Sequence, residues 1–171
     1  MSKPKRLILI LGDQLDWKSA ALKDFDLRSD EVVMIESIPE AQVVWSHKAK
    51  IALFLSAMRH FAQELKANGF PLHYVRDSNQ SIVDSLKAIL LQKSIKYLVC
   101  IEPGEWRLKQ AIEDLAQELG LQLDMREDEH FYCSHREFRE WAANKKELRL
   151  EFFYRLMRKA HHILLDEDGN P

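Results

Sequence analysis

The sequence predicts an α/β fold built on a doubly wound, mostly parallel five-stranded sheet with helices on both faces. Three observations predict it. Short apolar runs recur along the chain, longer amphipathic stretches separate them, and glycine or polar residues follow the ends of both. A wholly apolar run is typical of a strand that is buried on both faces, as in a parallel sheet. Alternation of such strands with helices favours right-handed crossovers and two helical layers.

The strands are expected where the apolar runs are shortest and most continuous. Residues 7–11 are all leucine or isoleucine, and Gly12 closes the run. Residues 32–35 repeat this pattern, and residues 97–101 form another run of the same kind. The five predicted strands cover residues 7–11, 32–35, 72–75, 97–101 and 121–125.

The helices are expected where apolar residues return every three or four positions, as they do along residues 47–68. Gly69 and Gly120 each follow such a stretch and are the predicted C-terminal caps. Ser134 precedes Glu137 by three positions, a spacing that is typical of a capping box. The five predicted helices cover residues 47–68, 81–92, 105–119, 134–145 and 148–161.

The composition is that of an ordinary soluble protein. The 171 residues suit one substantial core, so we expect a single α/β domain over residues 1–171. A net charge of −2 gives no general attraction to nucleic acid or to an anionic membrane. Cys100 and Cys133 make no disulfide framework, which indicates a reduced, cytoplasmic protein. The apolar run at residues 7–11 is too short for a signal segment or a membrane span.

Polar residues follow three of the predicted strands and mark the expected binding site. In doubly wound sheets, ligands bind outside the carboxyl ends of the strands. His47, at the start of the long helix, could contact such a ligand or simply lie at the surface. The candidates after the strands are Gly12, Asp13, Gln14, Glu36, Ser37, Glu40 and Glu105.

Asp13 occupies the position at which nucleotide-binding folds bind phosphate. The sequence contains no GxGxxG and no GxxxxGK[ST] pattern, and a carboxylate at this position would repel phosphate. The loop is better suited to a neutral polar ring whose N–H groups seek carboxylate acceptors. The alternative is that Asp13 merely caps a following helix.

Two other groups of residues leave alternatives open. Glu36 and Glu40 could act as acid and base on a small molecule, or they could lie in a solvated loop. His130, Cys133 and His135 have metal-binding side chains at close spacing, but no second ligand pair accompanies them. We therefore assign no metal site and no catalytic residue.

The C-terminal third is locally basic and rich in aromatic residues. Such a surface could bind a nucleic-acid strand, dock another domain or pack against the core. Four glutamates dilute the charge, which favours docking or packing over DNA binding. The basic residues are Arg136, Arg139, Lys145, Lys146, Arg149, Arg155, Arg158 and Lys159.

Several segments, taken in order along almost the whole chain, match one known family. They are LILGDQL at residues 9–15, SHK at 46–48, FLSAMRHFA at 54–62, EPGEWR at 102–107 and FFYRLMR at 152–158. In these segments the chain resembles the N-terminal domain of the bacterial photolyase-related proteins, the family of the iron–sulfur cryptochromes and six-four photolyases.

The resemblance implies a Rossmann-like domain that holds a light-harvesting antenna, a molecule like 6,7-dimethyl-8-ribityllumazine. By position, Asp13 and Glu40 match polar residues of the antenna pocket. The positions that match the walls of the pocket are Gly12, Gln14, Ile35, Glu36 and Ser37. His47 and Glu105 match the pocket less directly.

In this family a longer C-terminal helical domain holds FAD, an iron–sulfur cluster and the DNA lesion. The sequence ends where that domain would begin. We therefore expect the FAD-binding domain to be absent, DNA to be bound only through it, and this chain to repair no DNA by itself.

The leading hypothesis is thus an antenna-binding domain of a light-driven DNA repair or photoreceptor protein. The alternatives are a small-molecule enzyme that uses Glu36 and Glu40, and a protein-interaction module that acts through the C-terminal helices. Those helices carry more apolar residues than one packed face needs, so we also expect a homodimer through them.

Overall fold

A computed structural model of the chain describes residues 5–43 and 46–171. The chain divides into two compact units, the first ending at Glu127 and the second covering Asp128–Pro171. The prediction that residues 1–171 form a single domain stays a prediction. Within the described residues, no helix has the length and apolar character that crossing a membrane requires.

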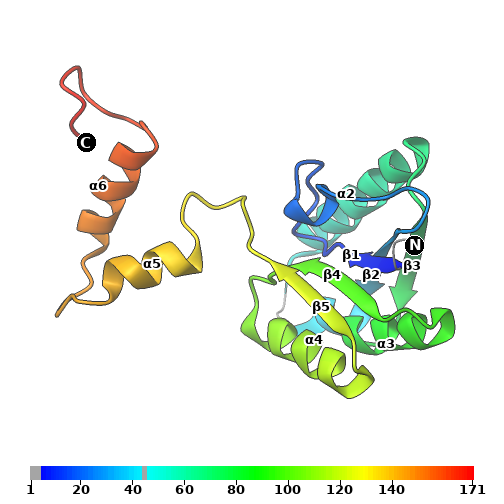
Figure 1. Cartoon of the computed structure of the whole chain (residues 1–171). Helices are drawn as coiled ribbons and strands as arrows, with labels where there is room; N and C mark the ends of the chain where they lie inside the picture. The colour runs from blue at the N-terminus through cyan, green and yellow to red at the C-terminus, as the bar shows by residue number, and fades with distance from the viewer. Residues whose placement is uncertain (1–4, 44–45) are drawn as a thin grey trace. The chain divides into compact units, whose positions relative to one another are not determined.

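The first unit contains a five-stranded sheet in which all neighbouring strands are parallel (Figure 1). Along the sheet the order is β3-β2-β1-β4-β5, so the chain moves outward in one direction and then returns to the other side of β1. The prediction of a doubly wound, five-stranded sheet is confirmed. The strands are β1 (Arg6–Leu9), β2 (Glu31–Ser37), β3 (Leu72–Ser78), β4 (Tyr97–Ile101) and β5 (Gln122–Arg126).

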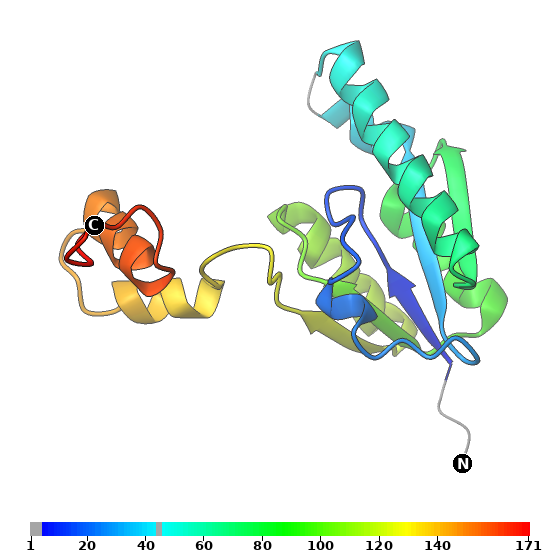
Figure 2. The ribbon, with the colours of Figure 1, turned by 90° about the horizontal axis from the view of Figure 1, so that it is seen from above.

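Helices cover both faces of the sheet. The two helices α3 (Ile82–Lys93) and α4 (Trp106–Leu119) pack on one face. The long helix α2 (Lys48–Ala67) and the 3-10 turn η1 (Ala20–Leu22) pack on the other. Figure 2 shows α2 on the near side of the sheet and α4 behind it.

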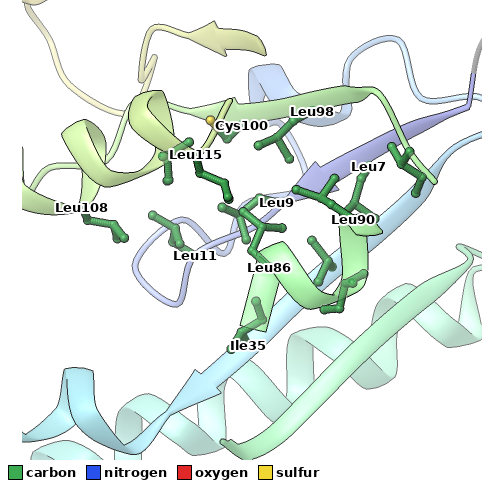
Figure 3. Close-up of a cluster of buried hydrophobic side chains, with 14 residues drawn as sticks. Leu7, Leu9, Leu11, Ile35, Leu86, Leu90, Leu98, Cys100, Leu108 and Leu115 are labelled. Carbon is green, nitrogen blue, oxygen red and sulfur yellow. The ribbon is translucent and has the colours of Figure 1, made fainter. Parts of the chain in front are cut away.

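The central strand explains why the first apolar run is continuous. Leu7 and Leu9 face α3 and α4, where they join a core that includes Leu86 (Figure 3). Ile8 points to the opposite face and packs with Phe61 of α2. Successive side chains of a strand alternate between faces, so a strand covered on both sides needs apolar residues at every position.

The predicted helix ends are confirmed by their caps. Gly69 has a φ of 80°, and the following amide of Phe70 donates to the carbonyl of Leu65. Gly120 also adopts the left-handed conformation, which glycine enters without steric cost. Ser134 and Glu137 form both halves of a capping box at the start of α5 (His135–Ala142).

Two elements differ from the sequence-based expectation. Residues 38–43, predicted as a loop, form the short helix α1 (Ile38–Val43), because proline is tolerated in the first turn of a helix. No α-helix lies between Asp13 and β2. The first helical turn after Asp13 begins at Ala20, with Ser19 as its cap. The alternative that Asp13 caps a following helix is therefore wrong.

The connection from β1 to β2 contains no α-helix. Side-chain ion pairs fix it to the sheet. The Arg6 guanidinium lies on the buried Asp30 carboxylate, with Nε 3.1 Å from Oδ1, and Nη1 donates to Asp24 at 2.7 Å. Arg126, from β5, donates to the other Asp24 oxygen at 2.8 Å. These pairs lower the pKa of Asp24, chiefly through the Arg126 hydrogen bond, and raise the pKa of Arg6.

The second unit contains α5 and α6 (Leu150–Ala160). Their contact is aromatic, with the Phe153 ring centroid 5.1 Å from that of Phe138 and 4.8 Å from that of Trp141. Other apolar side chains of this unit are exposed, and the homodimer expected from them stays a prediction. They are Phe131, Tyr132, Leu148, Leu150, Phe152, Tyr154, Leu156 and Leu164.

The buried Arg6–Asp30 pair yields a stability prediction. In Asp30→Ala the Arg6 guanidinium stays buried without its main counter-ion, and we expect the free energy of unfolding to fall by about 3–5 kcal/mol. Urea unfolding at pH 7 measures the change. The matched control is Glu118→Ala, which breaks the exposed pair with Lys87 and should cost at most about 1 kcal/mol. Equal losses in the two variants would contradict the prediction.

Candidate functional site

A cleft of about 360 Å³ opens where the carboxyl ends of β1 and β2 meet the turn after β4. Its floor and sides come from the ends of these strands, from α1 and from one face of α2. The volume lies in the range of small-molecule sites, and the place is that at which doubly wound sheets bind ligands. The position of the cleft follows from the strand order, because β2, β1 and β4 are neighbours in the sheet.

The structure brings most of the predicted site residues together in this cleft. They come from three separate stretches of the chain, which only the parallel sheet makes adjacent. The seven that line the cleft are Gly12, Asp13, Ile35, Glu36, Ser37, Glu40 and Glu105.

Two predicted residues, Gln14 and His47, do not line the cleft. The Gln14 amide nitrogen donates to the carbonyl of Glu102 at 3.3 Å, and its buried Oε1 atom has no hydrogen-bond partner among the described residues. His47 is the N-cap of α2, where its Nδ1 accepts the amide of Ala49 at 3.2 Å. His47 thus caps α2 at the surface, a structural role that its position in the sequence did not indicate.

The apolar wall of the cleft was missed by the sequence analysis. It consists largely of α2 residues whose apolar spacing indicated only a buried helix face. Phe54 belongs to that apolar pattern and is nevertheless 44% exposed. The only sequence signal for the wall is that α2 carries more apolar residues than its buried face needs. The α2 residues that line the cleft are Lys50, Ile51, Phe54, Leu55 and Met58.

Gly12 permits the close approach of this wall. A Cβ atom at position 12 would lie 2.5 Å from the Phe54 ring and 2.8 Å from the Met58 sulfur. Any larger residue would therefore push the Phe54 ring and the Met58 side chain away from the end of β1. The glycine that closes the first strand is required by packing at the cleft, not by an unusual φ angle.

Glu36 is buried at the end of β2 and is fully engaged by its neighbours. The Arg59 guanidinium donates a hydrogen bond to each carboxylate oxygen, at 2.9 Å and 2.8 Å, and the Tyr74 hydroxyl donates to Oε1. The Arg59 hydrogen bonds, followed by that of Tyr74, outweigh burial and hold the pKa of Glu36 below its usual value. Burial and the carboxylate raise the pKa of Tyr74 in turn. Glu36 is consequently ionised at neutral pH and is poorly suited to donate a proton.

Arg107 joins the two sides of the cleft rim. Its Nη2 atom lies 2.6 Å from Glu40 of α1, and its Nε atom lies 2.7 Å from Glu105 after β4. These two carboxylates, Glu40 first, raise the pKa of Arg107. Because Glu40 is engaged in this way, the geometry does not favour Glu36 and Glu40 as an acid–base pair.

Asp13 differs from the other carboxylates of the cleft. It makes no hydrogen bond or ion pair within residues 5–43 and 46–171, and it is exposed at the end of β1. Its oxygens are free to accept hydrogen bonds from a bound molecule. The cleft therefore combines an apolar wall, suited to a flat ring, with one available carboxylate at its mouth.

The parallel sheet, its reversal of direction beside β1 and the cleft at the strand ends define a Rossmann-like α/β domain with a cleft at the place where such sheets bind ligands. Residues 8–171 match the sequence profile of the deoxyribodipyrimidine photo-lyase-related proteins, and the chain belongs to that family.

One relative of the chain is described as a (6-4) photolyase from Agrobacterium fabrum (strain C58 / ATCC 33970). The two are 41% identical over 165 residues, which is 94% of this chain and 32% of that protein. The chain thus spans about a third of the length of this relative.

The lowered pKa of Glu36 predicts a pH-dependent contribution to stability. A carboxylate whose folded-state pKa is depressed stabilises the fold above its unfolded value, near 4.5, and loses this effect as the pH falls through the folded value. At pH 7, Glu36→Gln should lower the free energy of unfolding by about 1.5–3 kcal/mol. Below about pH 4.5 the difference from wild type should shrink. Urea unfolding at pH 7 and pH 3.5 tests this, and a pH-independent difference would contradict it.

Proposed function

We propose that the first unit is an antenna-binding domain and that its cleft holds a chromophore like 6,7-dimethyl-8-ribityllumazine. One observation carries the proposal. Seven positions that the family resemblance implies for the antenna pocket, scattered along the sequence, converge on a single cleft in a chain that belongs to the photolyase-related family.

The chemistry of the cleft suits such a molecule. The apolar face of α2, with Ile51 and Phe54, offers a surface for a flat heteroaromatic ring. The free Asp13 carboxylate can accept a hydrogen bond from a ring N–H or a ribityl hydroxyl, and hydrogen bonds to charged groups are the stronger kind. Although Glu40 is paired with Arg107, its carboxylate can still accept a further hydrogen bond at the rim.

The chain's own residues would hold and orient the chromophore and exclude water from it. A bound lumazine would supply light absorption in the near ultraviolet and blue and pass its excitation to FAD. In this proposal FAD, the iron–sulfur cluster and the DNA lesion belong to further sequence of the kind that makes the (6-4) photolyase relative about three times longer.

The competing enzyme hypothesis is less well supported. Both glutamates that it requires are held in ion pairs, Glu36 by Arg59 and Glu40 by Arg107. The lowered pKa of Glu36 also makes it a poor proton donor at neutral pH. Absorbance of the purified protein above 350 nm, where unmodified side chains are transparent, distinguishes the hypotheses, because a small-molecule hydrolase or isomerase needs no chromophore.

Fluorescence titration with 6,7-dimethyl-8-ribityllumazine tests the antenna proposal. Asp13→Ala and Glu40→Ala each remove a charged acceptor, and each should weaken binding by about 1.5–3 kcal/mol, or roughly ten- to a hundredfold in Kd. Glu118→Ala is the control, because it deletes the same charge far along α4 from the cleft. Wild-type affinity in both cleft variants would refute the assignment.

A second experiment concerns repair. We propose that this chain does not reverse DNA lesions by itself, since its match covers only about a third of the (6-4) photolyase relative. Illumination of the purified chain with added FAD and ultraviolet-damaged DNA should leave the lesion content unchanged. Light-dependent loss of lesions, measured by chromatography of the digested DNA, would show the proposal to be wrong.

A further inference from the structure

We propose that the cleft selects against ligands that carry a phosphate group and accepts an uncharged molecule that offers N–H and O–H donors. The inference rests on the proposed function and adds to it the charge class of the ligand. The fold has three features that could attract an anion, and at each of them a carboxylate of the protein is already present.

The first such feature is the turn after β1. In nucleotide-binding sheets of this type, phosphate lies at the N-terminus of the helix that follows the first strand. Here residues 12–19 contain two turns and no helix, and no α-helix starts between β1 and β2. Asp13 places an unpaired carboxylate at this position, where it repels phosphate and accepts hydrogen bonds.

The second feature is the N-terminus of α4, which lies beside the cleft. A helix N-terminus carries partial positive charge and would favour an anion. The N-cap residue is Glu105, whose side chain makes no cap hydrogen bond and lines the cleft. Its carboxylate therefore supplies the negative charge at this helix end before any ligand arrives.

The third feature is the set of cations around the cleft. Arg59 is paired with the buried Glu36, and Arg107 is shared between Glu40 and Glu105. The positive charge of each guanidinium is thus already balanced by carboxylates before a phosphate arrives. Lys50 lines the cleft and makes no ion pair within the described part of the chain, and its charge offsets no more than that of Asp13.

A matched pair of ligands tests the inference. The probes are 6,7-dimethyl-8-ribityllumazine and its ester with phosphate on the terminal ribityl hydroxyl, which differ only in that group. At low salt, we expect the ester to bind on the order of tenfold more weakly than the parent. The ratio should narrow as salt rises, because the Debye length falls from about 30 Å at 0.01 M to about 8 Å at 0.15 M.

A gain-of-function variant makes the test specific to the ion pairs. The double substitution Glu40→Gln with Glu105→Gln frees Arg107, whose guanidinium can then form two hydrogen bonds to phosphate. The ester should now bind at least as tightly as the parent. Adding Arg107→Gln to this double variant should restore the preference for the parent. Glu118→Gln, far along α4, controls for the change in overall charge.

Circular dichroism and thermal unfolding establish that each variant is folded. If the double variant does not fold, Asp13→Asn alone should bring the ester-to-parent Kd ratio at least threefold closer to one. Equal affinity of the wild type for both probes at low salt would overturn the charge selection and leave the antenna proposal standing. Failure of the wild type to bind either probe would overturn both.

Discussion

The burial of β1 on both faces is the constraint on which the rest of the structure depends. This strand is central in the sheet, with β2 and β4 as neighbours and helices above and below. Its apolar side chains are almost wholly excluded from water, from Leu7 at 0% exposure to Leu9 at 1%. A strand in this position ends at the point where the sheet changes direction, and the polar loop after it must face the cleft. Gly12 and Asp13 follow this strand, where the missing side chain leaves room for Phe54 and Met58 and the carboxylate lines the cleft.

Ion pairs between distant residues decide what the carboxylates of the cleft can do. Glu36 looks like a candidate acid when only its neighbours in sequence are considered. In the structure it is the centre of a network that holds the ends of β2 and β3 to α2, with Arg59 and Tyr74 as partners. The ladder between β2 and β3 shifts register between Ile35 and Ser37, and Asp77 adopts a φ of 48° nearby, which few residues other than glycine tolerate. The local irregularity therefore accompanies a buried, satisfied charge.

The three rim carboxylates differ in their partners and therefore in their roles. Glu40 and Glu105 come from opposite sides of the cleft and are joined through Arg107, so they shape the mouth. Asp13 has no such partner, and it is the group that remains free to meet a ligand. A site in which charge is mostly neutralised internally can bind a neutral molecule by shape and a few directed hydrogen bonds. This arrangement is compatible with the proposed antenna role, in which the protein orients a chromophore and does not react with it.

The sequence by itself determined the elements of this protein and the neighbourhood of its cleft. Strands, helices and most caps follow from local patterns: apolar runs, helical spacing, Gly69, Gly120 and the Ser134–Glu137 pair. The convergence of three loops was also predictable, because parallel strands of a doubly wound sheet have their carboxyl ends at one edge.

Only the tertiary structure decided which predicted residues reach the cleft and in what state. Gln14 and His47 are each next to a lining residue in the sequence, yet Gln14 donates to the distant Glu102 carbonyl and His47 caps α2. Glu36 finds Arg59 at a separation of 23 residues, and Glu40 finds Arg107 at a separation of 67. Pairings at such distances depend on how helices lie across the sheet, and the residues near each glutamate in the sequence contain no signal for them. Sequence patterns report the periodicity of single elements, whereas the charge state and availability of a side chain depend on what packs against it.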